Sequence, residues 1–91
     1  MAAGLRWSDA ALDDLAAIRA GLTAESAKRV GRIIVDAVDC LLEFPERGRP
    51  GIAAATRELP LPGLPWWVVY GPVAGGGVMI LRLLDLSRRS R

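Results

Sequence analysis

Few residues of this chain could take part in catalysis, and histidine, the most versatile catalytic residue type, is absent. The sequence contains no histidine, and its single cysteine is Cys40. Without histidine, neither a Ser-His nor a Cys-His nucleophile pair can be built, and the commonest general base is absent. One cysteine without histidine also cannot form the usual zinc sites. The sequence therefore excludes hydrolytic triads, and we expect no metal.

The remaining candidates for chemistry are weak. The carboxylates of Glu46, Glu58 and Asp85 show no spacing that singles out a catalytic pair, and each is more often a surface charge. Cys40 falls inside a predicted helix, where a small apolar side chain packs well, so we interpret it as part of the core. The glycine run 75–77 lacks the lysine and hydroxyl residue of a phosphate-binding loop and precedes a strand. We interpret it as a hairpin turn and expect no cofactor.

Two arginines lie inside predicted strands and are the more interesting candidates for binding. A guanidinium in an apolar sheet needs a carboxylate or carbonyl partner, and its planar fork can also grip a phosphate or a partner protein. Arg57 and Arg82 are in this position. Structural pairing, with Glu58 or Asp85 as possible carboxylates, is the alternative to a binding role.

Two amphipathic helices must help to position these residues. The first is predicted over 8–21, where Ser8 is well suited to cap the N-terminus. The second, over 24–43, has the strongest apolar periodicity and ends before Pro45, which disfavours helix at the preceding residue. Because the link between them is short, the helices should form an antiparallel hairpin.

Four strands complete the predicted fold, at 5–7, 56–61, 66–71 and 78–85. The sequence thus predicts one α+β domain over 1–91 with the order β-α-α-β-β-β, ending in a basic tail at 86–91. The helical hairpin should pack on one face of a small, mainly antiparallel sheet. We expect strand 5–7 beside strand 78–85, and strand 56–61 at the opposite edge because Pro60 cannot donate a ladder hydrogen bond.

The predicted sheet has more apolar surface than one helical hairpin can cover. Strict alternation in the last strand puts Met79, Leu81 and Leu83 on one face and Val78, Ile80, Arg82 and Leu84 on the other. Trp66 and Trp67 are adjacent and should point to opposite faces. A contiguous apolar face favours a partner segment, and a tolerated apolar patch is the alternative.

The single cysteine and the hydropathy make the cytoplasm the expected location. The net charge is only +2, and the arginines of the tail form a short run of the kind that is most often a solvated end. No apolar run approaches the ~20 residues needed to cross a bilayer, and the N-terminus lacks a signal-peptide pattern. We expect no membrane contact and no direct binding to DNA by this chain alone.

The ordered set of segments resembles the toxins of the ParE/RelE superfamily from bacterial toxin–antitoxin modules. The resemblance covers about residues 5 to 89 and does not depend on one decisive motif. It is carried by the order of the elements and by Trp7-Ser8, Asp14-Leu15, 44–51, 56–59, 66–70 and 80–84. It implies the helical hairpin and small sheet predicted above.

Within this superfamily the sequence is more similar to ParE, whose members inhibit DNA gyrase, than to the RelE-like nucleases that cleave mRNA on the ribosome. The nuclease branch relies on a cluster of basic residues with tyrosine or histidine. Trp67 stands where that branch would carry an arginine, and Asp85 stands where many relatives have histidine. Only Arg88 keeps a matching basic position. Without that cluster, no group is evident that would activate a 2′-hydroxyl or stabilise the reacting phosphate.

The resemblance therefore implies a type II toxin that acts by binding DNA gyrase, without enzymatic activity, and forms a hetero-oligomer with a ParD-like antitoxin. The C-terminal segment of such antitoxins wraps around the toxin and would cover the surplus apolar surface. We expect the contacts with target or partner to come from Arg57, Trp66, Trp67, Arg82, Leu84, Arg88 and Arg89. A RelE-like ribosome-dependent mRNA endonuclease and a non-toxic interaction module of the same fold are the alternatives.

Overall fold

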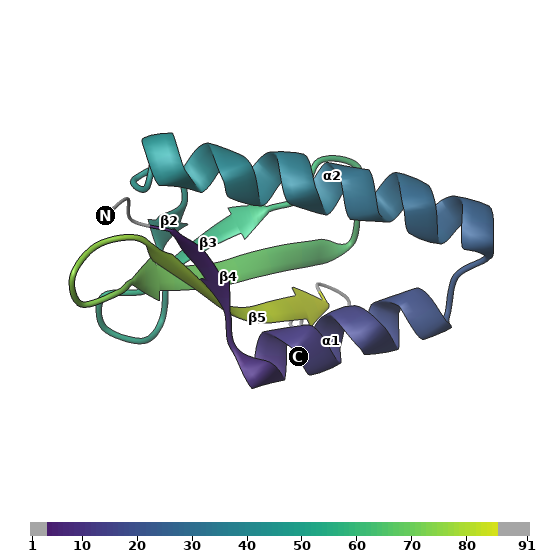
Figure 1. Ribbon diagram of the computed structural model, residues 1–91, viewed down its shortest axis with the longest axis horizontal. Helices are drawn as coiled ribbons and strands as arrows, with labels where there is room; N and C mark the ends of the chain where they lie inside the picture. The colour runs from purple at the N-terminus through teal and green to yellow at the C-terminus, as the bar shows by residue number, and fades with distance from the viewer. Residues whose placement is uncertain (1–3, 86–91) are drawn as a thin grey trace.

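A computed structural model describes residues 4–85, which form two helices and one five-stranded sheet (Figure 1). In chain order the elements are β1 (Leu5–Trp7), α1 (Asp9–Ala20), α2 (Ala24–Glu43), β2 (Arg49–Pro50), β3 (Arg57–Pro60), β4 (Trp66–Pro72) and β5 (Val78–Asp85). The strand order is β1-β5-β4-β3-β2, with β1 parallel to β5 and every other pair antiparallel. The predicted α+β class and the place of the first strand beside the last are confirmed.

Both helices begin at a side chain that caps the N-terminus. Ser8 Oγ accepts the N–H of Ala11 at 3.0 Å, and Thr23 Oγ1 accepts the N–H of Ser26 at 3.1 Å. These bonds satisfy N–H groups that have no partner within the helix. The helix starts are therefore determined locally, which explains why the sequence predicts them well.

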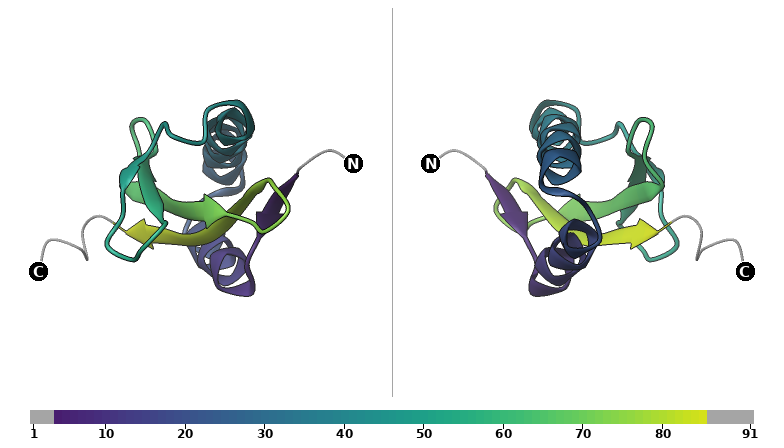
Figure 2. Two further views of the ribbon diagram at one scale, coloured as in Figure 1. Left: turned by 90° about the vertical axis from the view of Figure 1, so that its left-hand side faces the viewer. Right: turned by 90° about the vertical axis from the view of Figure 1, so that its right-hand side faces the viewer.

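The core lies between α2 and the sheet. The inward side of α2 carries Val30, Ile34, Val38 and Leu41, each at most 2% exposed. They belong to one apolar cluster with buried residues of β4 and β5, to which α1 adds Ala11. Figure 2 shows β2 and β3 on one side of the two helices and β1 on the other. No helix among residues 4–85 is long and apolar enough to cross a membrane.

α1 lies along the part of the β5 edge that β1 does not reach. β1 pairs with only three residues of β5, ending at Ile80. Beyond that point Ser8 donates its N–H to the Ile80 carbonyl and its hydroxyl to the Leu81 carbonyl, both at 2.9 Å, and Asp14 accepts the N–H of Leu83 at 2.9 Å. Side chains and backbone at the start of α1 therefore satisfy the edge of β5 where a strand would otherwise be needed.

The predicted loop before strand 56–61 contains an additional short strand, β2. It pairs with Arg57 and Glu58, so the prediction that strand 56–61 forms the sheet edge is wrong over these two residues. Pro60 lies beyond the residues that β2 pairs. The sheet edge is open at that position, which suits a residue without a backbone N–H.

A bulge in β5 overturns the predicted assignment of faces. β5 has one extra residue, Leu81, opposite the Val69–Tyr70 step of β4. Such a bulge reverses the faces of the residues that follow it. Leu83 and Ile80 are therefore both buried in the core, at 4% and 0% exposure, whereas strict alternation places them on opposite faces.

The hairpin turn between β4 and β5 is built from the glycine run, as predicted. Gly75, Gly76 and Gly77 have φ angles of 88°, 109° and 94°. Side chains disfavour this region of backbone conformation, and glycine adopts it without steric cost. The run therefore has a conformational role.

Candidate functional site

The face of the sheet directed away from α2 is the candidate site, and we call it the outer face. Residues that are direct neighbours across strands project from the same side of a sheet. The register forms one row across β2, β3, β4 and β5, a second row across β3, β4 and β5, and a third row across β4 and β5. The outer face consists of Arg49, Glu58, Val69 and Arg82 in the first row, Pro60, Trp67 and Leu84 in the second, and Gly71 and Met79 in the third.

Arg49 lies on the edge strand β2, and its side chain reaches from the first row of this face to the second. Its guanidinium carbon lies 3.9 Å from the centroid of the Trp67 ring, and its Nη2 lies 3.7 Å from Oε1 of Glu58. The Glu58 side chain is only 6% exposed, whereas that of Arg49 is 59% exposed. Burial of a carboxylate requires a cation or hydrogen-bond donors, and an exposed guanidinium gains from stacking on an indole. The cluster presents a cation held over an aromatic ring at the surface.

Arg82 is anchored by a carboxylate of α1. Its Nε lies 2.7 Å from Oδ2 of Asp14 and its Nη2 lies 3.0 Å from Oδ1, so the contact is bidentate. The Arg82 hydrogen bond lowers the pKa of the Asp14 carboxyl below its ordinary value, against the opposing effect of burial, and the Leu83 N–H lowers it further. The same hydrogen bond raises the pKa of Arg82. The sequence suggested Asp85 as the partner, and the structure provides Asp14 instead.

Arg57 and Trp66 lie elsewhere. Arg57 Nη1 donates to the carbonyl oxygens of Gly48 at 2.7 Å and Glu46 at 3.4 Å, and so holds the loop before β2. Arg57 thus has carbonyl partners in place of the carboxylate that the sequence suggested, and the Glu58 carboxylate is paired with Arg49. Trp66 packs against the core cluster on the side of the helices.

The outer face therefore brings together three of the predicted contact residues, Trp67, Arg82 and Leu84. Arg88 and Arg89 lie outside the described residues. Sequence reasoning missed Arg49, because its place in the row depends on β2, which the sequence did not predict. The same reasoning treated Glu58 as a surface charge, and the structure buries it to 4% exposure.

The hydroxyl of Tyr70, a candidate for proton transfer, is already hydrogen-bonded within the fold. The hydroxyl of Tyr70, the chain's only tyrosine, donates to the Pro45 carbonyl at 2.7 Å and accepts the Gly48 N–H at 2.8 Å. Tyr70 is 2% exposed and faces the core. Among residues 4–85, no group of three or more His, Cys, Asp or Glu side chains is arranged to hold a metal ion.

Cys40 is not a core residue, contrary to the prediction. It is half-buried, and its Sγ accepts a hydrogen bond from Arg47 Nη1 at 3.3 Å. It lines a groove of about 290 Å³ between α2 and the end of β3. Cys40 lies at the boundary of the apolar face of α2. The apolar periodicity of the sequence does not show on which side of that boundary a residue falls.

The most exposed apolar side chains lie on the helices and in the loop that follows α2, whereas the sequence placed the surplus on the sheet. Large apolar residues with 43–90% exposure are Leu12, Val35, Leu42, Phe44 and Ile52. On the outer face, Trp67 and Leu84 are half-buried. A partner that binds apolar side chains could therefore contact the helices as well as the sheet.

Comparison with known proteins gives consistent matches over nearly the whole chain. The family model for the ParE toxin of type II toxin-antitoxin system, parDE, matches residues 5–89. Toxin RelE2 of Caulobacter vibrioides is 40% identical over 86 residues, which cover 90% of this chain and 93% of that protein.

Two solved structures have the same fold. A chain in the chromosomal ParDE TA system from P. aeruginosa superposes with a TM-score of 0.78 and 28% identity, covering 92% of this chain and 96% of that one. A chain in the intact E. coli RelBE toxin-antitoxin complex gives a TM-score of 0.61 at 15% identity, with the same coverage of 92% and 96%. At that identity, the second match bears on the fold alone.

Proposed function

Because the chain belongs to the ParE toxin family of type II toxin–antitoxin systems, we propose that it inhibits DNA gyrase by protein binding and is neutralised by a ParD-like antitoxin. In this proposal the toxin needs a binding surface and no catalytic group. The outer face of the sheet is that surface. It combines two guanidinium groups with an indole and a leucine side chain.

The observation that supports this function is the stack of Arg49 on Trp67. Arginine and tryptophan are the residue types most enriched at the energetic centres of protein interfaces. The ring and the Glu58 carboxylate already restrict the Arg49 side chain, so binding would cost less conformational entropy than ordering a free arginine. The outer face is therefore suited to binding an acidic or aromatic protein surface.

The same contacts favour binding over RNA cleavage. A base that activates a 2′-hydroxyl must lie within hydrogen-bond reach of it. The carboxylate of the outer face, Glu58, is buried and paired with Arg49, and the hydroxyl of Tyr70 is engaged in the core. These contacts support a binding protein over the RelE-like endonuclease.

An antitoxin partner agrees with the distribution of apolar surface. Exposed apolar side chains such as Leu12 and Phe44 are spread over α1 and the end of α2, in no single pocket. A segment that folds as it binds can wrap over such dispersed side chains. We expect a hetero-oligomer with the antitoxin, which a pull-down with the product of a neighbouring small gene and a titration of the complex would measure.

A paired assay tests the function. Purified protein is added to gyrase supercoiling reactions and, separately, to ribosomes that translate a defined mRNA. We expect inhibited supercoiling and intact mRNA. Cleavage at defined codon positions with normal supercoiling would instead establish the endonuclease. Absence of both effects, together with tight binding of the antitoxin, would identify a non-toxic interaction module.

Variants locate the gyrase-binding surface. Arg49→Ala removes the stacked cation, and we expect the concentration for half-inhibition to rise about tenfold or more, as for a central interface residue. Arg19→Ala is the matched control, because Arg19 is an exposed arginine on α1 and belongs to none of the strand rows that form the outer face. Thermal melting of each variant verifies the fold. Equal inhibition by both variants would exclude the outer face as the gyrase contact.

A further inference from the structure

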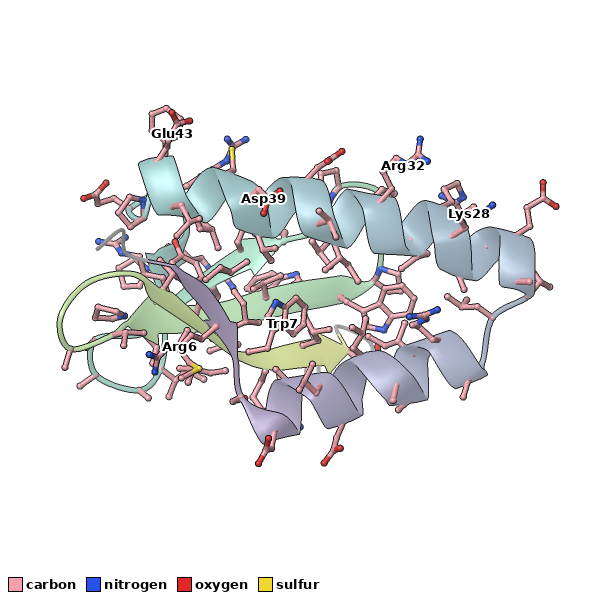
Figure 3. All side chains as sticks on the ribbon, in the orientation of Figure 1. Arg6, Trp7, Lys28, Arg32, Asp39 and Glu43 are labelled. Atoms are coloured by element: carbon pink, nitrogen blue, oxygen red, sulfur yellow. The ribbon has the colours of Figure 1, made fainter. Side chains whose placement is uncertain are left out.

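The solvent-facing side of α2 carries a charge pattern that the proposed function does not use. It lies on the opposite side of the helix from the buried stripe. The exposed residues follow at intervals of four, three, four and four positions, which keeps them on one helix face. This outward stripe consists of Lys28, Arg32, Val35, Asp39 and Glu43, and Figure 3 shows its charged members following one another along α2.

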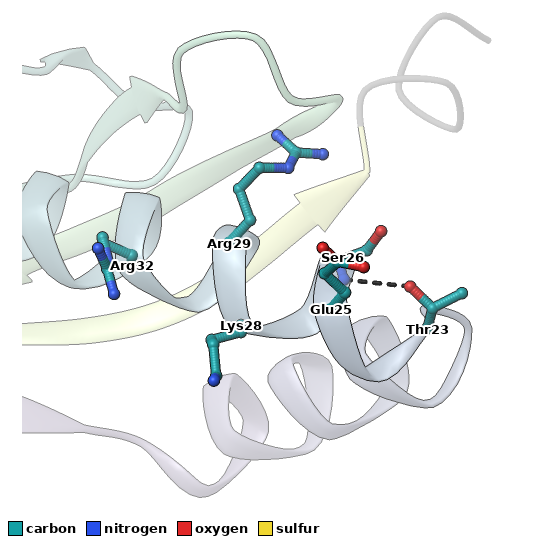
Figure 4. Close-up of a pocket in the computed structure, with 6 residues that line it drawn as sticks. All are labelled: Thr23, Glu25, Ser26, Lys28, Arg29 and Arg32. Carbon is teal, nitrogen blue, oxygen red and sulfur yellow. Dashed lines mark hydrogen bonds between the residues drawn. The ribbon is translucent and has the colours of Figure 1, made fainter.

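From Lys28 to Glu43 the charges of the outward stripe are segregated by sign, and the exposed Glu25, three residues before Lys28, is acidic. Lys28 and Arg32 lie in the N-terminal half of α2, and Arg29, the residue after Lys28, is a third cation whose side chain points to another side of the helix (Figure 4). Asp39 and Glu43 lie in the C-terminal half. None of these charged side chains makes a hydrogen bond or ion pair to another residue in the described part of the chain. Their charges are therefore available to a second molecule.

The like-charge pairs in this arrangement are unfavourable for α2 on its own, and the opposite-charge pair Arg32–Asp36 offsets part of that cost. Charges of one sign four residues apart repel on a helix, and both pairs in the stripe, Lys28–Arg32 and Asp39–Glu43, have this spacing. Glu43 also occupies the last turn, which contains no basic residue, although the helix dipole favours cations there. A surface with the complementary sequence of charges would relieve both effects.

We propose that the outward stripe binds the outward stripe of a second copy of this chain, with the two α2 helices antiparallel about a two-fold axis near Val35. Lys28 and Glu43 lie equally far from the midpoint between Val35 and Asp36, and so do Arg32 and Asp39. In an antiparallel pair Lys28 therefore faces the partner's Glu43, and Arg32 faces the partner's Asp39. A two-fold axis repeats each contact, which gives four complementary ion pairs from one patch.

Val35 lies next to the two-fold axis of this contact, where it faces the exposed Asp36 of the second copy. It is 52% exposed although it lies in the middle of the 20-residue helix, and Leu42, at 43% exposure, flanks the stripe. A helix of this length presents an edge of about 30 Å. One helix pair of that length falls below the roughly 1,200 Å² typical of stable interfaces, so the dimer is weak and depends on ionic strength.

Charge reversal of the full chain tests the geometry. One double variant, Lys28→Glu with Arg32→Glu, makes the stripe wholly acidic, and another, Asp39→Lys with Glu43→Lys, makes it wholly basic. A quadruple variant contains all four changes. Sedimentation equilibrium at low salt measures the self-association of each variant and of mixtures.

The expected results follow from the antiparallel pairing. Wild type dimerises reversibly, and added salt weakens the dimer. Each double variant alone has a dissociation constant about tenfold or more above that of wild type, because like charges then face each other. An equimolar mixture of the two double variants forms a heterodimer. The quadruple variant dimerises with itself and not with wild type.

Four results would overturn the proposal. A wild type that stays monomeric at high concentration and low salt excludes the dimer. Double variants that dimerise like wild type place the contact elsewhere. A folded quadruple variant that stays monomeric excludes the antiparallel register, and binding of the antitoxin that all stripe variants lose, without any dimer, would assign the stripe to the antitoxin.

Controls separate association from folding. The quadruple variant places acids toward the N-terminus and bases toward the C-terminus of α2, as the helix dipole favours, so its melting temperature should not fall. Asp13→Lys on α1 changes an exposed charge outside the stripe and should leave dimerisation unchanged. The dimer does not depend on gyrase binding. Gyrase inhibition can therefore still be measured in a variant that no longer dimerises, and dimerisation can be measured in a variant that no longer inhibits gyrase.

Discussion

Replacement of Asp14 by alanine tests how α1 is held to the sheet. The Asp14 carboxylate accepts three hydrogen bonds, two from Arg82 at 2.7 and 3.0 Å and one from the Leu83 N–H at 2.9 Å. Its side chain is 17% exposed, whereas that of Arg82 is 51% exposed. Solvent therefore screens the Asp14–Arg82 ion pair well. It screens the hydrogen bond from the Leu83 N–H to Asp14 much less.

The difference in exposure predicts how much the ion pair and the bond to the strand edge each contribute to the free energy of unfolding. A solvent-exposed ion pair contributes about 0–1 kcal/mol, whereas a buried N–H that loses its acceptor costs about 1–3 kcal/mol. We expect Arg82→Ala to lower the free energy of unfolding by about 0.5 kcal/mol and Asp14→Ala by about 2 kcal/mol. For a domain of this size, the second value lowers the melting temperature by roughly 8–16 °C.

Thermal and urea unfolding at two pH values measure these effects. The pKa of Asp14 is lowered by folding, so its contribution is present above the ordinary value of 3.8 and is lost as the pH falls through the lower pKa of the folded state. The difference between wild type and Asp14→Ala should be full at pH 7 and should shrink below pH 3.8. Asp13→Ala is the matched control on the exposed side of α1.

Two results would refute this account of the α1 contact. Equal losses for Arg82→Ala and Asp14→Ala would mean that the ion pair, and not the strand edge, carries the stability. A loss for Asp13→Ala as large as that for Asp14→Ala would show that helix propensity or net charge is responsible.

Three further changes test the fold by denaturant unfolding. Tyr70→Phe removes the hydroxyl that bonds two backbone groups of the loop before β2, and we expect a loss of about 2 kcal/mol with the secondary structure retained. Gly77→Ala should cost about 2 kcal/mol or more, since φ is 94° and the new Cβ would collide with the backbone of Gly4, whereas Gly75→Ala meets open space and should cost only about 1–2 kcal/mol for its positive φ. Ser8→Ala should cost about 1–2 kcal/mol, because its hydroxyl both caps α1 and donates to β5; a loss below 0.5 kcal/mol would make these bonds dispensable.

Features of the fold that depend on neighbouring residues were predictable from the sequence. Ser8 and Thr23 begin the helices because their hydroxyls reach N–H groups three residues away. The glycine run forms a turn because of its own backbone freedom. The short link between the helices and the hairpin connections between strands then leave few ways to arrange the sheet.

Features that depend on distant residues were not predictable. Leu81 is left unpaired by the register between β5 and β4, and this bulge changes the face of every later residue of β5. Asp14 and Arg82 are 68 positions apart, and no local pattern connects them. On the outer face, Trp67 and Arg82 were found as unusual residues in strands, whereas Arg49 and the burial of Glu58 required the two-residue strand β2.

The contact of α1 with β5 also protects the sheet against unwanted growth. A strand edge with free N–H and carbonyl groups invites further strands, and a chain with 52% hydrophobic residues would be prone to aggregate through such an edge. The sheet ends in the three-residue strand β1 on one side and the two-residue strand β2, which contains Pro50, on the other. Ser8 and Asp14 occupy the remaining edge of β5. A partner that tried to add a strand there would first have to detach α1, so recognition through side-chain surfaces is the easier route.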